Sequence, residues 1–175
     1  MKVTLSWFEV FQGVQSGGMR RIEAMKHTRQ PIYGEPNLDL WGLDIEAALA
    51  EIAVAKAYDL YWEGVARAPS QLRGDVSNLQ VRSTYREDGC LILHEDDPDD
   101  ALFVLVTGRA PTYTIRGWMK AAEGKSPKWW REGDGRPAFF VPQTALNRSS
   151  PVGEGRLLTG PWPASKSTTK VTSSL

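Results

Sequence analysis

The pattern of apolar and polar positions predicts helices in the first third of the chain. Apolar residues recur at roughly helical spacing over residues 6–27, and Ser6 followed by Glu9 is typical of a capping box at the start of such a helix. A second helix is predicted from residue 40 or 43 to residue 58. This segment is apolar on nearly every side, which indicates that it is buried.

Short segments in the middle of the chain read as strands. The Asp88-Gly89 pair is a hairpin signal and predicts that the first two strands pair with each other, whereas Ala110-Pro111 separates the later two. We therefore predict an α/β fold with a mixed central sheet flanked by helices. Strands are expected near 79–86, 90–94, 102–108, 112–118 and 138–141, with a short helix at 118–123 and irregular chain at 28–40 and 61–73.

The end of the chain differs in composition from the rest. From about residue 148 it is rich in Ser, Thr, Gly and Pro and has little to bury, so residues 148–175 are predicted to form a flexible tail or to lie over the surface. Residues 1–147 are then expected to form one domain, which suits a chain of 175 residues.

Charge and cysteine content limit the classes of function. The 21 basic residues are balanced by 21 acidic ones, so the chain as a whole is not a strongly basic nucleic-acid binder. The charges are uneven, however: residues 87–100 hold seven acids and no Lys or Arg, and residues 112–175 hold ten basic residues against four acids. A basic surface and a mixed, solvated exterior are equal alternatives.

The sequence also predicts a cytoplasmic protein without a membrane span. It contains no apolar run of about 18 residues and begins without a secretory pattern. Cys90 is the only cysteine, which excludes a disulfide within the chain and a multi-cysteine zinc site.

One acid in the second predicted helix has unusual neighbours. The positions three and four residues from Glu51 on the helix surface carry no basic side chain. A buried carboxylate needs a counter-charge, a hydrogen bond or a metal. A metal ion on the one hand, and exposure or a salt bridge to a distant Arg on the other, are equal alternatives. The neighbouring residues are Ala47, Ala48, Val54 and Ala55.

Further polar side chains follow in the first predicted strand. Gln80 and Arg82 share one face of that strand, about 7 Å apart. A turn-type pair at 77–78 allows Asp75 to fold back beside Gln80. Taken singly, these residues are typical of turns and surfaces. Together with Glu51 they would form a cradle of oxygen atoms and one guanidinium, which suits a hard divalent metal and a phosphate.

The order Glu51, Asp75, Gln80-x-Arg82 resembles the PD-(D/E)XK nuclease superfamily. In that superfamily a helix acid, an Asp at a strand end and a Glu-x-Lys strand surround Mg²⁺. Over residues 4–147 the chain is also similar to a group of small phage and prophage proteins. The matching stretches include Trp41, Glu51-Ile-Ala-Val-Ala-Lys56, Asp75-Val76, Gln80-Val-Arg-Ser-Thr84, Val104-Leu-Val-Thr-Gly108 and Phe140-Val-Pro-Gln143.

The resemblance implies a restriction-endonuclease-like core and a DNA endonuclease that depends on Mg²⁺ or Mn²⁺. Glu51, Asp75 and Gln80 would hold the metal, and Arg82 would polarise the scissile phosphate as the fourth catalytic residue. The chain departs from the motif because Gln replaces Glu and Arg replaces Lys. The site then has two formal negative charges, and Arg82 cannot serve as a general base because it stays protonated.

Two other classes of function stay open. The Gln80-x-Arg82 variant also suits a nuclease-fold protein that has lost its chemistry and binds DNA or a phage or host protein. Besides DNA, the partners expected for the chain are a second copy of itself or a phage protein. The third class is a structural component of the virion. For a protein of the first two classes, the expected location is the host cytoplasm. Trp129-Trp130 could stack on bases, although one ring in the core is the commoner arrangement. The residues expected to contact DNA are Arg20, Arg21, Lys26, Lys125, Lys128 and Arg131.

Overall fold

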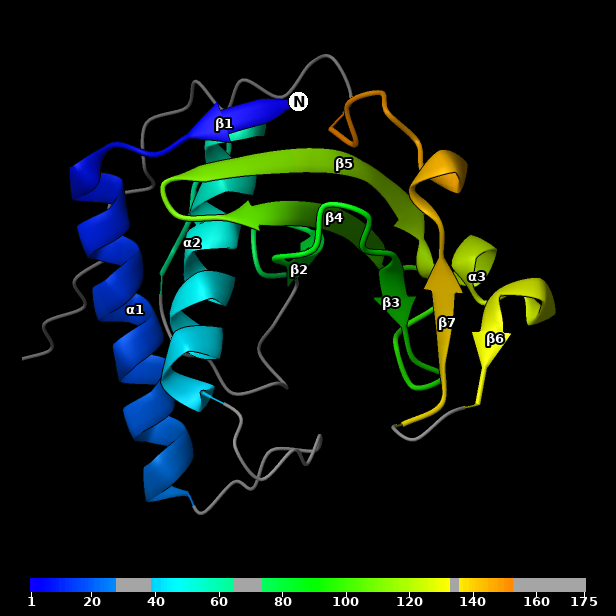
Figure 1. The fold of residues 1–175 in the computed structure, drawn as a ribbon, viewed down its shortest axis with the longest axis horizontal. Coiled ribbons are helices and arrows are strands. Elements are labelled where there is room, and N and C mark those ends of the chain that lie inside the picture. Colours follow the sequence, from blue (N-terminus) through cyan, green and yellow to red (C-terminus); the bar gives the residue numbers. More distant parts are fainter. Residues whose placement is uncertain (28–38, 65–73, 133–135, 153–175) are drawn as a thin grey trace, which may run out of the picture.

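Three layers make up the structure, a computed structural model that describes residues 1–27, 39–64, 74–132 and 136–152 (Figure 1). Two helices form the first layer, a four-stranded sheet the second and a three-stranded sheet the third. Within the described residues, no helix combines the length and apolar character that a bilayer crossing requires.

Both predicted helices are confirmed. Helix α1 spans Trp7–Lys26 and helix α2 spans Leu40–Tyr58. The capping box is present, because Glu9 N donates to Ser6 Oγ over 3.2 Å and Ser6 N donates to Glu9 Oε2 over 2.6 Å. The middle of α2 is buried from residue 48 to residue 55, as its apolar sequence indicates.

The first sheet is mixed, as predicted, with strand order β1-β5-β4-β2. Strand β2 runs parallel to β4, and the other pairs are antiparallel. Strand β2 therefore lies at one edge of the sheet, and none of the described strands pairs with its outer side. The strands are β1 (Lys2–Thr4), β2 (Leu79–Thr84), β4 (Leu102–Arg109) and β5 (Thr112–Lys120).

The predicted hairpin between the first two strands is wrong. Gly89 N does donate to Arg86 O, so a local turn exists, but the strand that follows joins the second sheet, in the order β3-β7-β6. Leu91 and Leu93 of β3 are fully buried against the first sheet, and this burial outweighs the local turn signal. The strands of this sheet are β3 (Leu91–Leu93), β6 (Trp130–Arg131) and β7 (Ala138–Val141).

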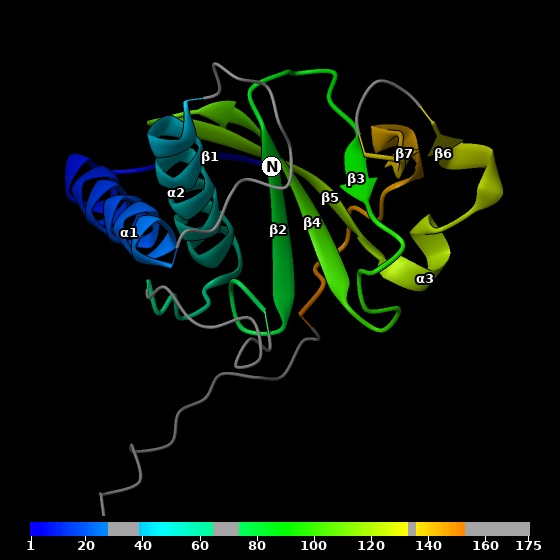
Figure 2. The same ribbon diagram turned by 90° about the horizontal axis from the view of Figure 1, so that it is seen from below.

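The two faces of the first sheet are covered differently, because helices flank only one of them and the second sheet covers the other. In β4, Val104 and Val106 pack with α2, whereas Phe103 and Leu105 pack against the second sheet. Alternation along a single strand thus supplies two separate hydrophobic clusters. Figure 2 shows α1 and α2 on one side of the central strands and β3, β6 and β7 on the other.

The remaining differences are small. The short helix α3 covers Ala121–Gly124, because β5 continues to Lys120. Strands β1 and β6 were not predicted, and they are only three and two residues long. The predicted irregular segments lie largely outside the described residues, and so does the predicted tail from residue 153 onward.

Candidate functional site

Glu51 lies buried in the middle of α2 and is paired with an arginine from α1. Arg20 Nη1 is 2.5 Å from Glu51 Oε1, and Arg20 Nη2 donates to Oε2 over 2.6 Å. Trp62 Nε1 also donates to Oε2, over 2.8 Å. Of the alternatives left open by the sequence, the salt bridge to a distant arginine is therefore the one observed.

Small residues on α1 make this pairing reachable. Gly13, Ser16 and Gly17 are buried against α2, and a Cβ atom on Gly17 would lie only 2.4 Å from the Cα atom of Ile45. The backbones therefore approach closely, which brings the Arg20 side chain to Glu51. The hydrogen bond and charge of Glu51 raise the pKa of Arg20, although burial opposes the charged form.

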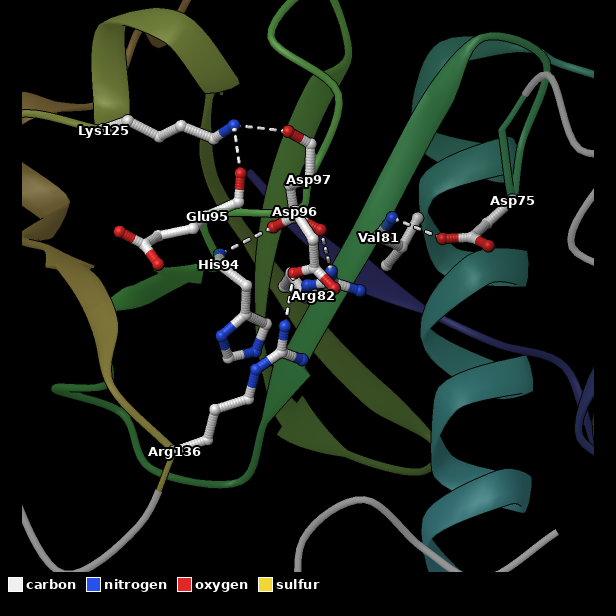
Figure 3. Close-up of polar contacts among 9 residues, drawn as sticks. All are labelled: Asp75, Val81, Arg82, His94, Glu95, Asp96, Asp97, Lys125 and Arg136. Carbon is white, nitrogen blue, oxygen red and sulfur yellow. Dashed lines mark hydrogen bonds and ion pairs between the residues drawn. The ribbon is translucent and has the colours of Figure 1, made fainter.

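Asp75 lies in the loop that enters β2 and folds back on the strand. Asp75 N and Val76 N both donate to Leu79 O, and Ser77 has φ of 58°, so the predicted turn is confirmed. Asp75 Oδ2 accepts a hydrogen bond of 2.7 Å from Val81 N (Figure 3). Val81 belongs to an edge strand, and the carboxylate satisfies an amide that no strand in the described part of the chain accepts.

The carboxyl of Asp75 is in an electrostatically unfavourable position. Burial, followed by the charge of Glu51, raises its pKa from 3.8 to about 6. The hydrogen bond from Val81 and the charges of Arg82 and Arg20 oppose this rise only in part. Glu51 and Asp75, predicted to converge, are thus within electrostatic reach of each other and share Arg20 as a nearby cation.

Gln80 and Arg82 belong to the other face of β2, so the predicted four-residue cradle is not assembled. Arg82 Nη2 is 3.0 Å from Asp97 Oδ1, and its guanidinium lies 4.9 Å from the ring centroid of Phe103, in the second cluster. Alternation places Gln80 on the same face. The reason is burial: Leu79 and Val81 occupy the face that packs with α2.

Two of the predicted site residues, Arg82 and Lys125, contact the acidic segment 94–100. Asp97 accepts hydrogen bonds from Arg82 and from His94 N, at 3.0 and 2.8 Å. Lys125 Nζ donates to the carbonyl oxygens of residues 95 and 97 and lies 2.7 Å from Asp99 Oδ1. Arg82 and Lys125 therefore hold this loop in place (Figure 3).

The six residues expected to contact DNA all have partners within the chain. Besides Arg20 and Lys125, Lys128 lies over the Trp129 ring, and Arg131 donates to two backbone carbonyls. Trp130 packs on Phe139 at 4.8 Å between ring centroids, and both Trp129 and Trp130 are half-buried against the second cluster, so the expected division into one core ring and one edge ring is wrong. The other two pairs are Arg21 with Asp44 and Lys26 with Glu23.

The sequence did not predict a basic cavity that lies at the opposite edge of the first sheet. Its volume is about 700 Å³, and Lys56, Arg116 and Arg148 line it together with Asp59 and the N-terminal residue. Arg148 forms no ion pair with any residue in the described part of the chain. The excess of basic residues after position 112 indicated a basic surface. Lys56, Arg116 and Arg148 are far apart in the sequence, so their spacing did not predict that they meet.

The fold is that of a mixed α/β protein in which two carboxylates, Glu51 on α2 and Asp75 before the edge strand β2, lie within electrostatic reach of each other. Among the residues that the structure describes, no group of three or more His, Cys, Asp or Glu side chains is arranged to hold a metal. Comparison of this chain with protein-family models, curated proteins and solved structures returned no match.

Proposed function

We propose that this chain is a Mg²⁺- or Mn²⁺-dependent DNA endonuclease in which Glu51 and Asp75 hold the metal. The observation that supports this is the placement of two carboxylates near each other, Glu51 buried on α2 and Asp75 half-buried before β2. Burial and the Glu51 charge together raise the pKa of Asp75 to about 6. A divalent cation beside both carboxylates would remove their repulsion. Perturbed carboxyl groups of this kind are typical of functional sites.

The residues present fit such a metal in part. Mg²⁺ is commonly bound by one or two carboxylates, with water and substrate phosphate oxygens as its other ligands. Asp75 Oδ1 accepts no hydrogen bond from a described residue and is available as a ligand. Glu51 Oε1 becomes available when Arg20 releases it, whereas Oε2 keeps the hydrogen bond from Trp62 Nε1. Gln80 faces the other side of β2 and does not fit.

In this proposal Arg20 takes the role that the resemblance gave to Arg82. Its side chain is 22% exposed, and a guanidinium can bind two phosphate oxygens through parallel hydrogen bonds. The cation, when bound, supplies charge stabilisation at the phosphate. Asp75 must be ionised to hold it, so activity is expected to rise as the pH increases through about 6.

Cleavage of supercoiled plasmid in Mn²⁺ tests the proposal. Asp75→Asn removes the charge of the carboxylate with little change in shape, and Asp88→Asn, in an exposed turn, is the matched control. We expect nicking by the wild type and by the control, and a loss of at least about a hundredfold in Asp75→Asn, which is the usual scale for removing a group that stabilises the transition state. Equal absence of nicking in all three, across metals and DNA forms, would contradict catalysis.

A second candidate is DNA binding without catalysis. Arg20 already satisfies both oxygens of Glu51, and the basic cavity offers Arg116 and Arg148 to an anionic ligand. Anisotropy of labelled duplex DNA in EDTA distinguishes the two candidates. Binding that survives Asp75→Asn and is lost in Arg148→Glu would favour this candidate.

A further inference from the structure

Helix α1 exposes its large apolar side chains and buries its small residues. The residues packed on α2 include Gly13, Ser16 and Gly17, whereas the large apolar residues on the outer face are 40% to 77% exposed. An ordinary surface helix has the reverse arrangement. In Figure 1, α1 is the outermost helix on its side of the molecule. The exposed residues are Trp7, Phe8, Phe11, Val14, Met19, Ile22 and Met25.

The centre of this outer face follows the spacing of a helix–helix seam. Successive members are three and then four residues apart, which is the heptad pattern of helices that pack along their length. None of the six members carries a charge. They are Phe8, Phe11, Gln15, Gly18, Ile22 and Met25, and we call them the α1 seam.

The α1 seam is complementary to itself in the antiparallel direction. A two-fold axis at the level of residues 16 and 17 places Phe8 against Met25 of a second copy and Phe11 against its Ile22. The same axis places Gln15, the longest polar member, against Gly18, the smallest. Large side chains thus meet at both ends and a long one meets a short one at the centre, as a symmetric interface requires.

We infer that the α1 seam is the interface of a homodimer in which two α1 helices pack antiparallel. The exposed apolar side chains of this face present on the order of 800 Å² per copy, the size of a standard interface. Trp41, 46% exposed, extends the face next to Gly18. This interface does not depend on the proposed function, because Arg20 lies on the inner side of α1 with Glu51.

Charges at the flanks do not oppose this packing. Lys26 pairs with Glu23 at 2.6 Å and Arg21 pairs with Asp44 at 2.8 Å, both within one chain. No unpaired charge of these residues has to be buried when two copies meet. The α1–α2 layers of both copies would then form a four-helix arrangement across the two-fold axis.

Sedimentation equilibrium of the full chain with two complementary variants tests the inference. We expect the wild type to be dimeric, and Phe11→Glu or Ile22→Lys alone to weaken dimerisation by at least about a hundredfold, because each buries an unpaired charge. A mixture of the two single variants is expected to recover the dimer, since the acid introduced in one copy meets the base introduced in the other only in the antiparallel register. Tyr61→Glu, at an exposed aromatic outside α1, is the control and is expected to stay dimeric.

Three results would overturn it. The first is a wild type that stays monomeric at high protein concentration. The second is a dimer that persists in Phe11→Glu. The third is a mixture in which the two variants fail to recover the dimer. A monomeric wild type that floats with anionic vesicles would assign the outer face of α1 to a membrane surface and likewise contradict a homodimer.

Discussion

At the residue scale, Asp75 is held in the folded state at a cost. Its carboxyl is desolvated and lies near a second acid, and both effects favour the protonated form. The hydrogen bond from Val81 N needs only an oxygen acceptor and no charge. The negative charge of Asp75 is therefore unfavourable for stability, as expected of a group selected for binding rather than for folding.

Asp75→Asn is predicted to stabilise the protein at neutral pH by about 1–3 kcal/mol, the upper end corresponding to roughly two pKa units. The folded wild type holds an additional proton between pH 3.8 and about 6, so its stability falls as the pH rises through that window and is level above it. The stability of Asp75→Asn does not fall over this pH window, because the asparagine side chain does not titrate. Urea unfolding of both proteins on either side of the window measures the difference, and a gap that does not widen with increasing pH would contradict the assignment.

Arg82 is predicted to act on stability and not on metal binding. Arg82→Ala leaves Asp97, whose side chain is 12% exposed, without its ion pair and is expected to cost about 1–2 kcal/mol. Asp97→Ala should cost a similar amount, and the double variant less than the sum, because one interaction is lost. The exposed Arg86–Asp88 pair is the control, with an expected change below about 0.5 kcal/mol. Additive losses in the cycle would argue against this role.

At the element scale, the close approach of α1 and α2 positions Arg20 at Glu51. Gly17→Ala is predicted to destabilise by about 1–3 kcal/mol, because its Cβ would lie 2.4 Å from backbone. Gly18→Ala is the matched control; its Cβ meets nothing nearer than 4.0 Å and should stabilise the helix by up to about 1 kcal/mol. Both substitutions are measured by thermal unfolding in the Phe11→Glu variant, in which dimerisation is weakened, so that the measured change reports the packing of α1 on α2 within one chain. Equal effects at both positions would contradict tight packing at Gly17.

The elements could be predicted to different degrees. The capping box and the apolar run gave α1 and α2 correctly, because these signals are local. The partner of a strand is not local: Asp88-Gly89 forms a turn, but Leu91 and Leu93 pair across to β7 and bury against the first sheet. A turn signal states that the chain reverses and does not state which strand lies beside it.

At the scale of the whole molecule, two of the four predicted catalytic residues come together and two do not. The sequence correctly placed Gln80 and Arg82 on one face of β2 and Leu79 and Val81 on the other. The buried helix α2 packs on the apolar face of β2, so Glu51 and Gln80 lie on opposite sides of the first sheet. The burial pattern of α2 and of β2, considered together, would have predicted that Glu51 does not meet Gln80 and Arg82. The pairing of Arg20 with Glu51 depends on the packing of α1 on α2, and no local sequence pattern predicts it.

Calorimetric titration with Mn²⁺ at neutral pH probes the paired carboxylates themselves, since it needs no knowledge of the substrate. We predict one Mn²⁺ per chain, lost in Asp75→Asn, retained in Asp88→Asn, and weakened as the pH falls below about 6. Arg20→Gln should bind the ion more tightly than the wild type, because Glu51 Oε1 is then released and a competing positive charge is removed. Absence of binding in the wild type, or equal binding by Asp75→Asn, would contradict a metal site at Glu51 and Asp75.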